Sequence, residues 1–260
     1  MTQLVAFGKG GLRIRDLLRT IALKYPPELV AVQLRDIERI AFHIALVVDR
    51  KGMNATVCDI GGGIGMFSVG CAALGMRSIL VDDFRDGVNL QFGESALEVH
   101  RCYGVEVLSK DAVKDDVELP ASSVDAITCF ESMEHWHHSP KSLFEKLRFA
   151  LKPGGVFVLS APNCVDLKRR LTVPFGYGKW SSMESWYNST VFRGHVREPD
   201  ADDLRHIATD MGLSDVEIRG RNWWPYSRFS GPLRVVAVAA DTILRVRPSL
   251  CSTIYVTGHV

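Results

Sequence analysis

Short apolar runs alternate with amphipathic stretches along most of the chain after residue 55. The runs have the length of buried β-strands, and the stretches between them carry apolar residues at helical spacing. Strands that alternate with helices in this way predict βαβ units and a parallel sheet. We expect strands at residues 56–60, 78–81, 105–108, 124–130, 156–160, 216–219 and 253–257. We expect helices near residues 66–74, 96–103, 143–151, 199–211 and 233–246.

Two parts of the chain depart from this alternation. Near the N-terminus, apolar positions at helical spacing are interrupted only at Pro26-Pro27, which indicates a helical cap. Near the middle, the periodicity lapses over a long stretch that holds Tyr177, Trp180, Trp186 and Tyr187. So long an irregular segment inside a compact domain is typical of a functional lid. The expected boundaries are 1–52 for the cap, 53–260 for the main domain and 163–198 for a lid insertion within it.

The composition changes this picture little. Of the 260 residues, 47% are hydrophobic and 23% are charged, and the formal net charge is +1. A charge so close to zero gives no global attraction to nucleic acid, which we do not expect as a partner. The six cysteines form no CxxC pair, as expected of a reduced, cytoplasmic chain. The apolar stretches are too short to span a bilayer, so we expect no membrane insertion, and the oligomeric state is left open.

The most informative segment is the run Asp59-Ile60-Gly61-Gly62-Gly63-Ile64-Gly65, which lies between a predicted strand and a predicted helix. Glycines let the backbone turn sharply and approach a ligand, and the helix N-terminus supplies free N–H groups. One interpretation is a dinucleotide loop of the GxGxxG type with Ser68 in the last glycine's place. The protein would then be a nucleotide-linked oxidoreductase.

The run Asp59-x-Gly61-x-Gly63-x-Gly65 also resembles the first motif of class I S-adenosylmethionine-dependent methyltransferases. Further motifs follow in that family's order: Asp82 after the second strand, Lys110-Asp111-Ala112 after the third, and Leu151-Lys152-Pro153-Gly154-Gly155 before the fifth. The resemblance implies a Rossmann-like α/β fold with a seven-stranded, mostly parallel sheet flanked by helices, its last strand antiparallel.

The same resemblance implies S-adenosylmethionine as the cofactor. A carboxylate at Asp82 would accept hydrogen bonds from the ribose hydroxyls, with Asp83 as the rival for that role, and Asp111 would lie near the adenine. The alternative roles are a solvated strand end for Asp82 and a turn cap for Asp111. The expected cofactor-binding residues are Asp59, Gly61, Gly63, Gly65, Asp82, Asp111 and Phe130.

After the fourth strand comes the ExxEH pattern Glu131-Ser132-Met133-Glu134-His135. In a helix these two carboxylates and the imidazole would share one face. Such a cluster repels itself without a cation and suits a divalent metal. Composition alone favours the alternative, in which the glutamates are solvated loop residues and the histidine is a hydrogen-bonded core group.

The later segment Phe192-Arg193-Gly194-His195 shifts this balance. An ExxEH motif followed by a distant histidine resembles two metal-dependent groups, the ubiquinone-pathway O-methyltransferases and the small-RNA terminal 2′-O-methyltransferases. The resemblance implies the metal ligands Glu131, Glu134, His135 and His195. Magnesium is the expected ion, and the mixed ligand set leaves manganese and zinc open. The candidate catalytic groups are Glu134, His135 and His138, with His138 or its neighbour His137 as a proton acceptor or a simple loop residue.

The aromatic lid and the segment 192–198 resemble bacterial methyltransferases of polysaccharide or glycoside biosynthesis. This implies methylation of a sugar hydroxyl in a small-molecule or oligosaccharide acceptor. Flat aromatic side chains with polar edges suit sugar rings, although Trp180, Trp186, Trp223 and Trp224 could equally be packing residues. The alternatives are a phenol or quinone precursor, and a terminal RNA ribose, which the absence of any recognisable RNA-binding module disfavours. The intact glycines and ExxEH motif argue against a non-catalytic methyltransferase-like subunit.

Overall fold

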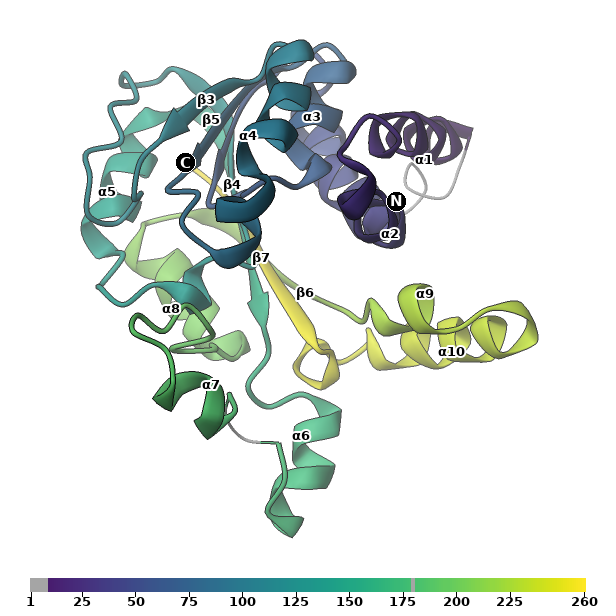
Figure 1. The fold of residues 1–260 in the computed structure, drawn as a ribbon. Helices are drawn as coiled ribbons and strands as arrows, with labels where there is room; N and C mark the ends of the chain where they lie inside the picture. The colour runs from purple at the N-terminus through teal and green to yellow at the C-terminus, as the bar shows by residue number, and fades with distance from the viewer. Residues whose placement is uncertain (1–8, 179–180) are drawn as a thin grey trace.

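A seven-stranded sheet forms the centre of the computed structural model, which describes residues 9–178 and 181–260 (Figure 1). The strands are β1 (Thr56–Ile60), β2 (Arg77–Asp82), β3 (Glu106–Ser109), β4 (Val124–Phe130), β5 (Leu151–Pro162), β6 (Ser214–Arg221) and β7 (Thr253–His259). Their order across the sheet is β3-β2-β1-β4-β5-β7-β6, and β7 runs antiparallel to both of its neighbours. The predicted fold class, including the antiparallel last strand, is confirmed.

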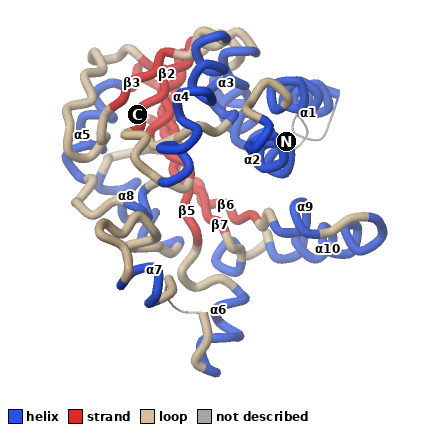
Figure 2. Tube along the Cα trace, in the orientation of Figure 1, coloured by secondary structure: helices blue, strands red, loops and turns tan. Residues whose placement is uncertain are grey.

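Helices cover both faces of this sheet (Figure 2). One hydrophobic cluster joins one face to α1 (Lys9–Ala22), α2 (Pro27–Lys51), α3 (Met66–Ala73) and α4 (Gly87–Cys102). A second cluster joins the other face to α5 (Lys141–Ala150) and α8 (Ala201–Asp210). The expected N-terminal helices therefore share a core with the sheet.

The central strands are buried on both sides because their side chains alternate between the two clusters. In β5, Val156 and Val158 belong to the first cluster, whereas Phe157 and Leu159 belong to the second. This is the period-two geometry of a pleated strand, and it explains why β5 is a continuous apolar run and not an alternating one.

The order of the sheet determines where a ligand can bind. The chain leaves β1 toward β2 on one side, and β4 lies on the other side of β1. Such a reversal of strand order opens a crevice at the carboxyl ends of the strands. The glycine-rich loop begins there, and the backbone N–H of Gly61 donates to the carbonyl oxygen of Val81 at 2.7 Å.

The remaining elements are short helices and turns, apart from α10. They are α6 (Leu167–Thr172), α7 (Met183–Tyr187), α9 (Trp224–Arg228), α10 (Gly231–Leu244) and the 3₁₀ turns η1 (Met133–His135), η2 (Val173–Phe175) and η3 (Pro248–Leu250). The expected lid thus contains two short helices, and α9 and α10 form a hairpin that extends away from the sheet (Figure 1). Among the described residues, no helix combines the length and apolar character needed to cross a bilayer.

Candidate active site

A cavity of about 730 Å³ opens at the carboxyl ends of β1, β2 and β4 and is lined in part by the glycine-rich loop. The loop is shaped by close packing as well as by backbone conformation. A Cβ atom at Gly61 would overlap the hydroxyl of Ser132, and one at Gly62 would overlap the carboxylate of Asp59. Gly61 and Gly63 have φ angles of 71° and 56°, in the left-handed region that glycine adopts readily. Gly63 differs in facing open space, since its Cβ would meet nothing closer than Asn89 at 3.7 Å.

Asp82 holds the loop in place from the end of β2. Its Oδ2 atom accepts from the backbone N–H of Gly63 at 3.0 Å, and its Oδ1 atom accepts from that of Phe84 at 2.7 Å. Burial raises the pKa of Asp82 to about 6. The rival residue, Asp83, forms an ion pair with Arg193 at 2.9 Å, which links β2 to the segment that carries His195.

The expected cofactor residues have two kinds of position. Gly61, Gly63, Asp82, Asp111 and Phe130 line the cavity. Asp59 and Gly65 are not among its lining residues and instead support the loop from behind.

These two supporting residues are fixed by hydrogen bonds from neighbouring side chains. The Asp59 carboxylate accepts from Thr128 Oγ1 at 2.8 Å and from Ser68 Oγ at 3.2 Å, and burial raises its pKa to about 7. The Gly65 carbonyl accepts from His100 Nε2 at 3.1 Å and from Tyr25 in the α1–α2 loop at 3.3 Å. The N-terminal helices thereby contribute to the position of the loop.

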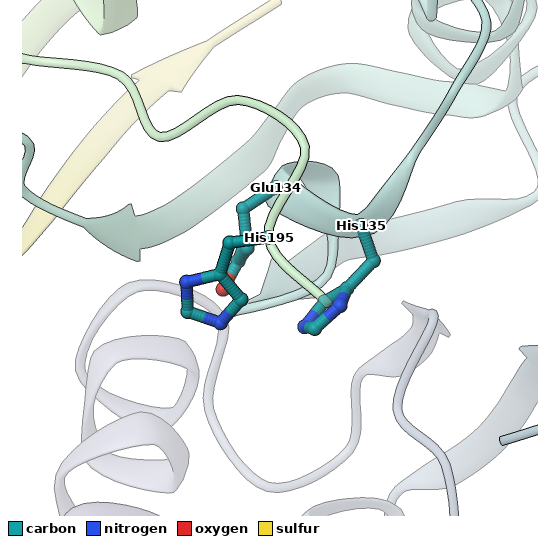
Figure 3. Close-up of side chains that lie close together, drawn as sticks. All are labelled: Glu134, His135 and His195. Atoms are coloured by element: carbon teal, nitrogen blue, oxygen red, sulfur yellow. The ribbon is translucent and has the colours of Figure 1, made fainter. Parts of the chain in front are cut away.

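Glu134, His135 and His195 come together beside this cavity (Figure 3). Each offers one ligand atom, and these atoms lie within 4.8 Å of one another. Glu134 and His135 belong to η1, whereas His195 comes from the segment before α8. Two backbone hydrogen bonds join the segments, because the Glu134 carbonyl accepts from Val196 at 2.7 Å and from Arg197 at 3.3 Å.

A hydrogen bond at Nδ1 fixes the orientation of each imidazole ring in the cluster. His135 donates from Nδ1 to the carbonyl of Arg193 at 2.8 Å, and His195 donates from Nδ1 to Glu198 Oε1 at 2.6 Å. In the neutral ring each Nε2 therefore carries the lone pair, which is the arrangement of metal-binding histidines. The hydrogen bond to Glu198 also raises the pKa of His195, so the protonated ring is favoured there when no cation is bound. Glu198 also pairs with Arg169. Although burial opposes it, these partners lower the pKa of Glu198 to about 2. Sequence reasoning missed Glu198, and its spacing of three residues from His195 was the available signal.

The Glu134 carboxylate is almost inaccessible, with 1% of the residue exposed. Its Oε2 atom is buried and has no hydrogen-bond partner among the described residues. Burial raises its pKa to about 7, so the ionised form is unfavourable without a compensating charge. A buried carboxylate with an unpartnered oxygen, beside two imidazoles, is a donor set that fits a divalent cation.

Glu131 does not lie on one helix face with Glu134 and His135, contrary to the expectation from the sequence. Its φ angle of 50° breaks the helical path, and η1 begins only at Met133, so Glu131 does not share a face with Glu134. Its carboxylate pairs with Arg39 of α2 instead, and Arg39 also contacts Asp36 at 2.7 Å. Three of the four expected ligands are thus brought together, and Glu131 stands apart from them.

The two further histidines of this region lie at the rim. His137 and His138 are exposed and line the cavity, and His137 lies 2.8 Å from the carbonyl oxygen of Phe192. His138 is therefore the more available of the two for a substrate proton.

A second cavity, of about 760 Å³, adjoins the first and shares Arg39 and Glu131 with it. Its aromatic lining residues are Trp223, Trp224, Tyr226 and Phe229. The expected lid aromatics are elsewhere: Tyr177, Trp186 and Tyr187 are exposed and line neither cavity, and Trp180 lies outside the described residues. The aromatic lining of the second cavity comes instead from the loop and helix after β6. Trp223 packs against the core, which places the residues that follow it at this cavity.

Solved structures confirm the fold across nearly the whole chain. An S-adenosylmethionine-dependent methyltransferase from Thermotoga maritima aligns with a TM-score of 0.56 at 15% identity, covering 95% of this chain and 99% of its own. Phosphoethanolamine N-methyltransferase 2 from Haemonchus contortus aligns with a TM-score of 0.55 at 18% identity, covering 97% of this chain and 61% of its own. Magnesium protoporphyrin IX methyltransferase from Synechocystis aligns with a TM-score of 0.53 at 15% identity, covering 98% of this chain and 96% of its own.

The matches found by sequence cover a shorter part of the chain than the structural ones. A ubiquinone biosynthesis O-methyltransferase from Xanthomonas axonopodis is 33% identical over 114 residues, which is 42% of this chain and 44% of that protein. The match therefore spans less than half of the curated relative. A family model described as a methyltransferase domain matches residues 32–218, from α2 to β6. The glycine loop, the Asp82 position and the Glu134–His135–His195 cluster all fall within that range, and the chain belongs to this family of S-adenosylmethionine-dependent methyltransferase domains.

Proposed function

We propose that this protein transfers a methyl group from S-adenosylmethionine to a sugar hydroxyl, with a divalent cation bound by Glu134, His135 and His195. The observation that carries the proposal is the buried, unpartnered Oε2 atom of Glu134 facing two imidazoles whose Nδ1 atoms are already engaged. Labelled methyl transfer measured before and after removal of divalent metal tests it.

The cavity at the glycine loop suits the cofactor. Gly63 leaves room for a ligand at the loop, and Asp82 presents a carboxylate that can accept from a ribose diol. Phe130 offers an apolar surface at the end of β4. Its ring is fixed from behind by stacking on His43, with a centroid separation of 3.8 Å.

The cluster at the cavity rim supplies the chemistry that a sugar hydroxyl needs. A bound cation would stabilise the alkoxide that develops on the acceptor. The protein aligns the acceptor with the methyl group, and His138, exposed at the rim, is positioned to take the proton. Glu198 holds His195 in the tautomer that presents Nε2 to the cluster.

The second cavity is the proposed acceptor site. Aromatic faces from Trp224, Tyr226 and Phe229 can stack on a sugar ring, while Arg35, Asp36 and Glu38 supply polar partners for its hydroxyls. A phenol is the second candidate acceptor, favoured by the local match to a ubiquinone biosynthesis O-methyltransferase. A phenol would use the same aromatic faces but fewer of the charged partners.

Trp224→Ala should raise the KM for the acceptor at least about tenfold and leave cofactor affinity unchanged, because it removes a stacking face from the second cavity alone. The matched control is Trp186→Ala, which changes an exposed tryptophan that lines neither cavity. Steady-state kinetics with varied acceptor measures the effect. An unchanged KM in Trp224→Ala would place the acceptor elsewhere.

Cofactor affinity should depend on the protonation of Asp82. The pKa of its carboxyl is raised to about 6, so the side chain loses an acceptor oxygen as the pH falls below that value. We expect S-adenosylhomocysteine to bind about tenfold more weakly at pH 5 than at pH 7. Titration calorimetry at both values measures the change, and Asp82→Asn should bind weakly at both. A wild-type affinity that stays constant over this range would remove Asp82 from the ribose contact.

A further inference from the structure

In helix α10 the acidic residue faces inward and large apolar residues face outward. This is the reverse of an ordinary surface helix, whose polar face meets water. The acidic residue of α10, Asp241, is fully buried and bonds Asn222 at 2.8 Å and Arg245. Its outward face carries the large apolar side chains of Leu233, Val235, Val236 and Ile243, and Val246 follows the end of the helix; each is between 67% and 86% exposed. An outward face of this kind on a projecting hairpin indicates a surface that meets something other than water.

A second apolar segment lies at the end of the lid that is joined to this hairpin. Leu171 in α6 is exposed, as are Val173, Phe175 and Tyr177 after it, Phe175 by 78%. The side chain of Arg170 in α6 reaches the carbonyl of Ser249 in η3, the turn that follows α10, at 3.4 Å. α6, α9 and η3 also contribute lining residues to the second cavity.

Within these two segments the exposed charges are all positive. Lys168, Arg170, Arg228 and Arg247 are exposed and form no ion pair within the described residues. Residues 167–178 and 223–250 contain a single acidic residue, the buried Asp241. The nearby carboxylates Asp36, Glu38 and Asp166 lie in the second cavity. Exposed apolar side chains on segments whose exposed charges are all positive are complementary to a bilayer that carries anionic headgroups.

We propose that α10, together with the segment after α6, docks on the surface of an anionic lipid bilayer. The apolar side chains enter the headgroup boundary, and the arginines and Lys168 contact lipid phosphates. A second copy of this chain is the less suitable partner, since a two-fold contact would bring the same arginines against one another. Docking places the membrane beside the second cavity, and it does not depend on the reaction proposed above.

The test is vesicle flotation with the full chain, using phosphatidylcholine alone and phosphatidylcholine with about 30 mol% phosphatidylglycerol. We expect binding to the anionic vesicles that weakens at high salt. Val236→Asp/Ile243→Asp should reduce binding at least about tenfold, and Arg228→Gln or Arg247→Gln should reduce it about fivefold each. The matched control is Leu90→Asp, which adds a charge to a leucine 73% exposed on α4 and should bind as the wild type does.

Two results would overturn the proposal. One is failure of the wild type to float with anionic vesicles. The other is a stable dimer in light scattering that Val236→Asp/Ile243→Asp abolishes, because the patch would then be an interface between copies. S-adenosylhomocysteine binding by each variant reports its folding, so loss of lipid binding with retained ligand binding supports docking and leaves the catalytic account unaffected.

Discussion

Methyl transfer by the His195→Ala protein is expected to be at least about 100-fold slower than by the wild type, with cofactor affinity unchanged. The substitution removes one of three ligands, and the stabilisation that a cation gives to a developing alkoxide is worth several kcal/mol, where each 1.4 kcal/mol or so is tenfold in rate. Glu134→Gln should have a similar effect because it keeps the shape of the side chain and removes its charge. Glu198→Gln should be milder, about 10-fold to 100-fold, since Glu198 orients His195.

The control for these variants is His206→Ala, which removes an exposed histidine of α8 that belongs to neither cavity. It should transfer methyl groups at the wild-type rate. Metal content measured by mass spectrometry should fall in His195→Ala and Glu134→Gln and stay unchanged in His206→Ala. Wild-type turnover in His195→Ala would show that the cluster is structural, and general-base catalysis by His138 would then be the better account.

Cofactor binding should be lost in Gly63→Leu. The φ angle of 56° strains any side chain at this position by about 1–2 kcal/mol, and the leucine would also extend into the cavity that the loop lines. We expect the affinity for S-adenosylhomocysteine, measured by calorimetry, to fall at least about 100-fold, which exceeds what backbone strain alone would give.

Gly104→Leu separates the two effects. Gly104 has a φ angle of 76°, lies in the turn between α4 and β3, and has nothing within 4 Å of its Cβ position. It carries comparable strain with no cavity beside it, so it should lower the melting temperature and leave affinity intact. Equal loss of affinity in both variants would mean that Gly63 acts through stability. NAD should bind neither the wild type nor the variants, and tight NAD binding would revive the oxidoreductase alternative.

The fold was predictable because its signals are local. Buried parallel strands must be apolar on both faces, so each appears in the sequence as a short uninterrupted run, as β5 does. The bounds were less accurate at helix starts: the predicted helix near 96–103 begins at Gly87, where Asp86 caps it by accepting from Val88 and Asn89. The first half of this helix carries its apolar residues Val88, Leu90 and Phe92 two positions apart, so it lacks the helical spacing on which the prediction relied.

The sequence predicted those parts of the site whose residues are close together in the chain. Glu134 and His135 are adjacent in the chain, and His195 joined them through a resemblance and not through any periodicity. The left-handed backbone at Glu131 gave no such signal, and neither did Arg39, which reaches Glu131 from α2. The sequence assigned the candidate acceptor aromatics to the lid, whereas the aromatic residues that line the second cavity follow β6, because composition shows which residues are present and not which of them line a cavity.

Labelled methyl transfer from S-adenosylmethionine to a panel of glycosides and phenols, before and after removal of divalent metal, tests the central claim most directly. We expect label to enter a sugar oxygen, excess chelator to depress turnover while S-adenosylhomocysteine still binds, and added magnesium or manganese to restore activity. Undiminished transfer in excess chelator would contradict the role of Glu134, His135 and His195. Transfer confined to phenols would contradict the sugar acceptor and leave the metal site standing.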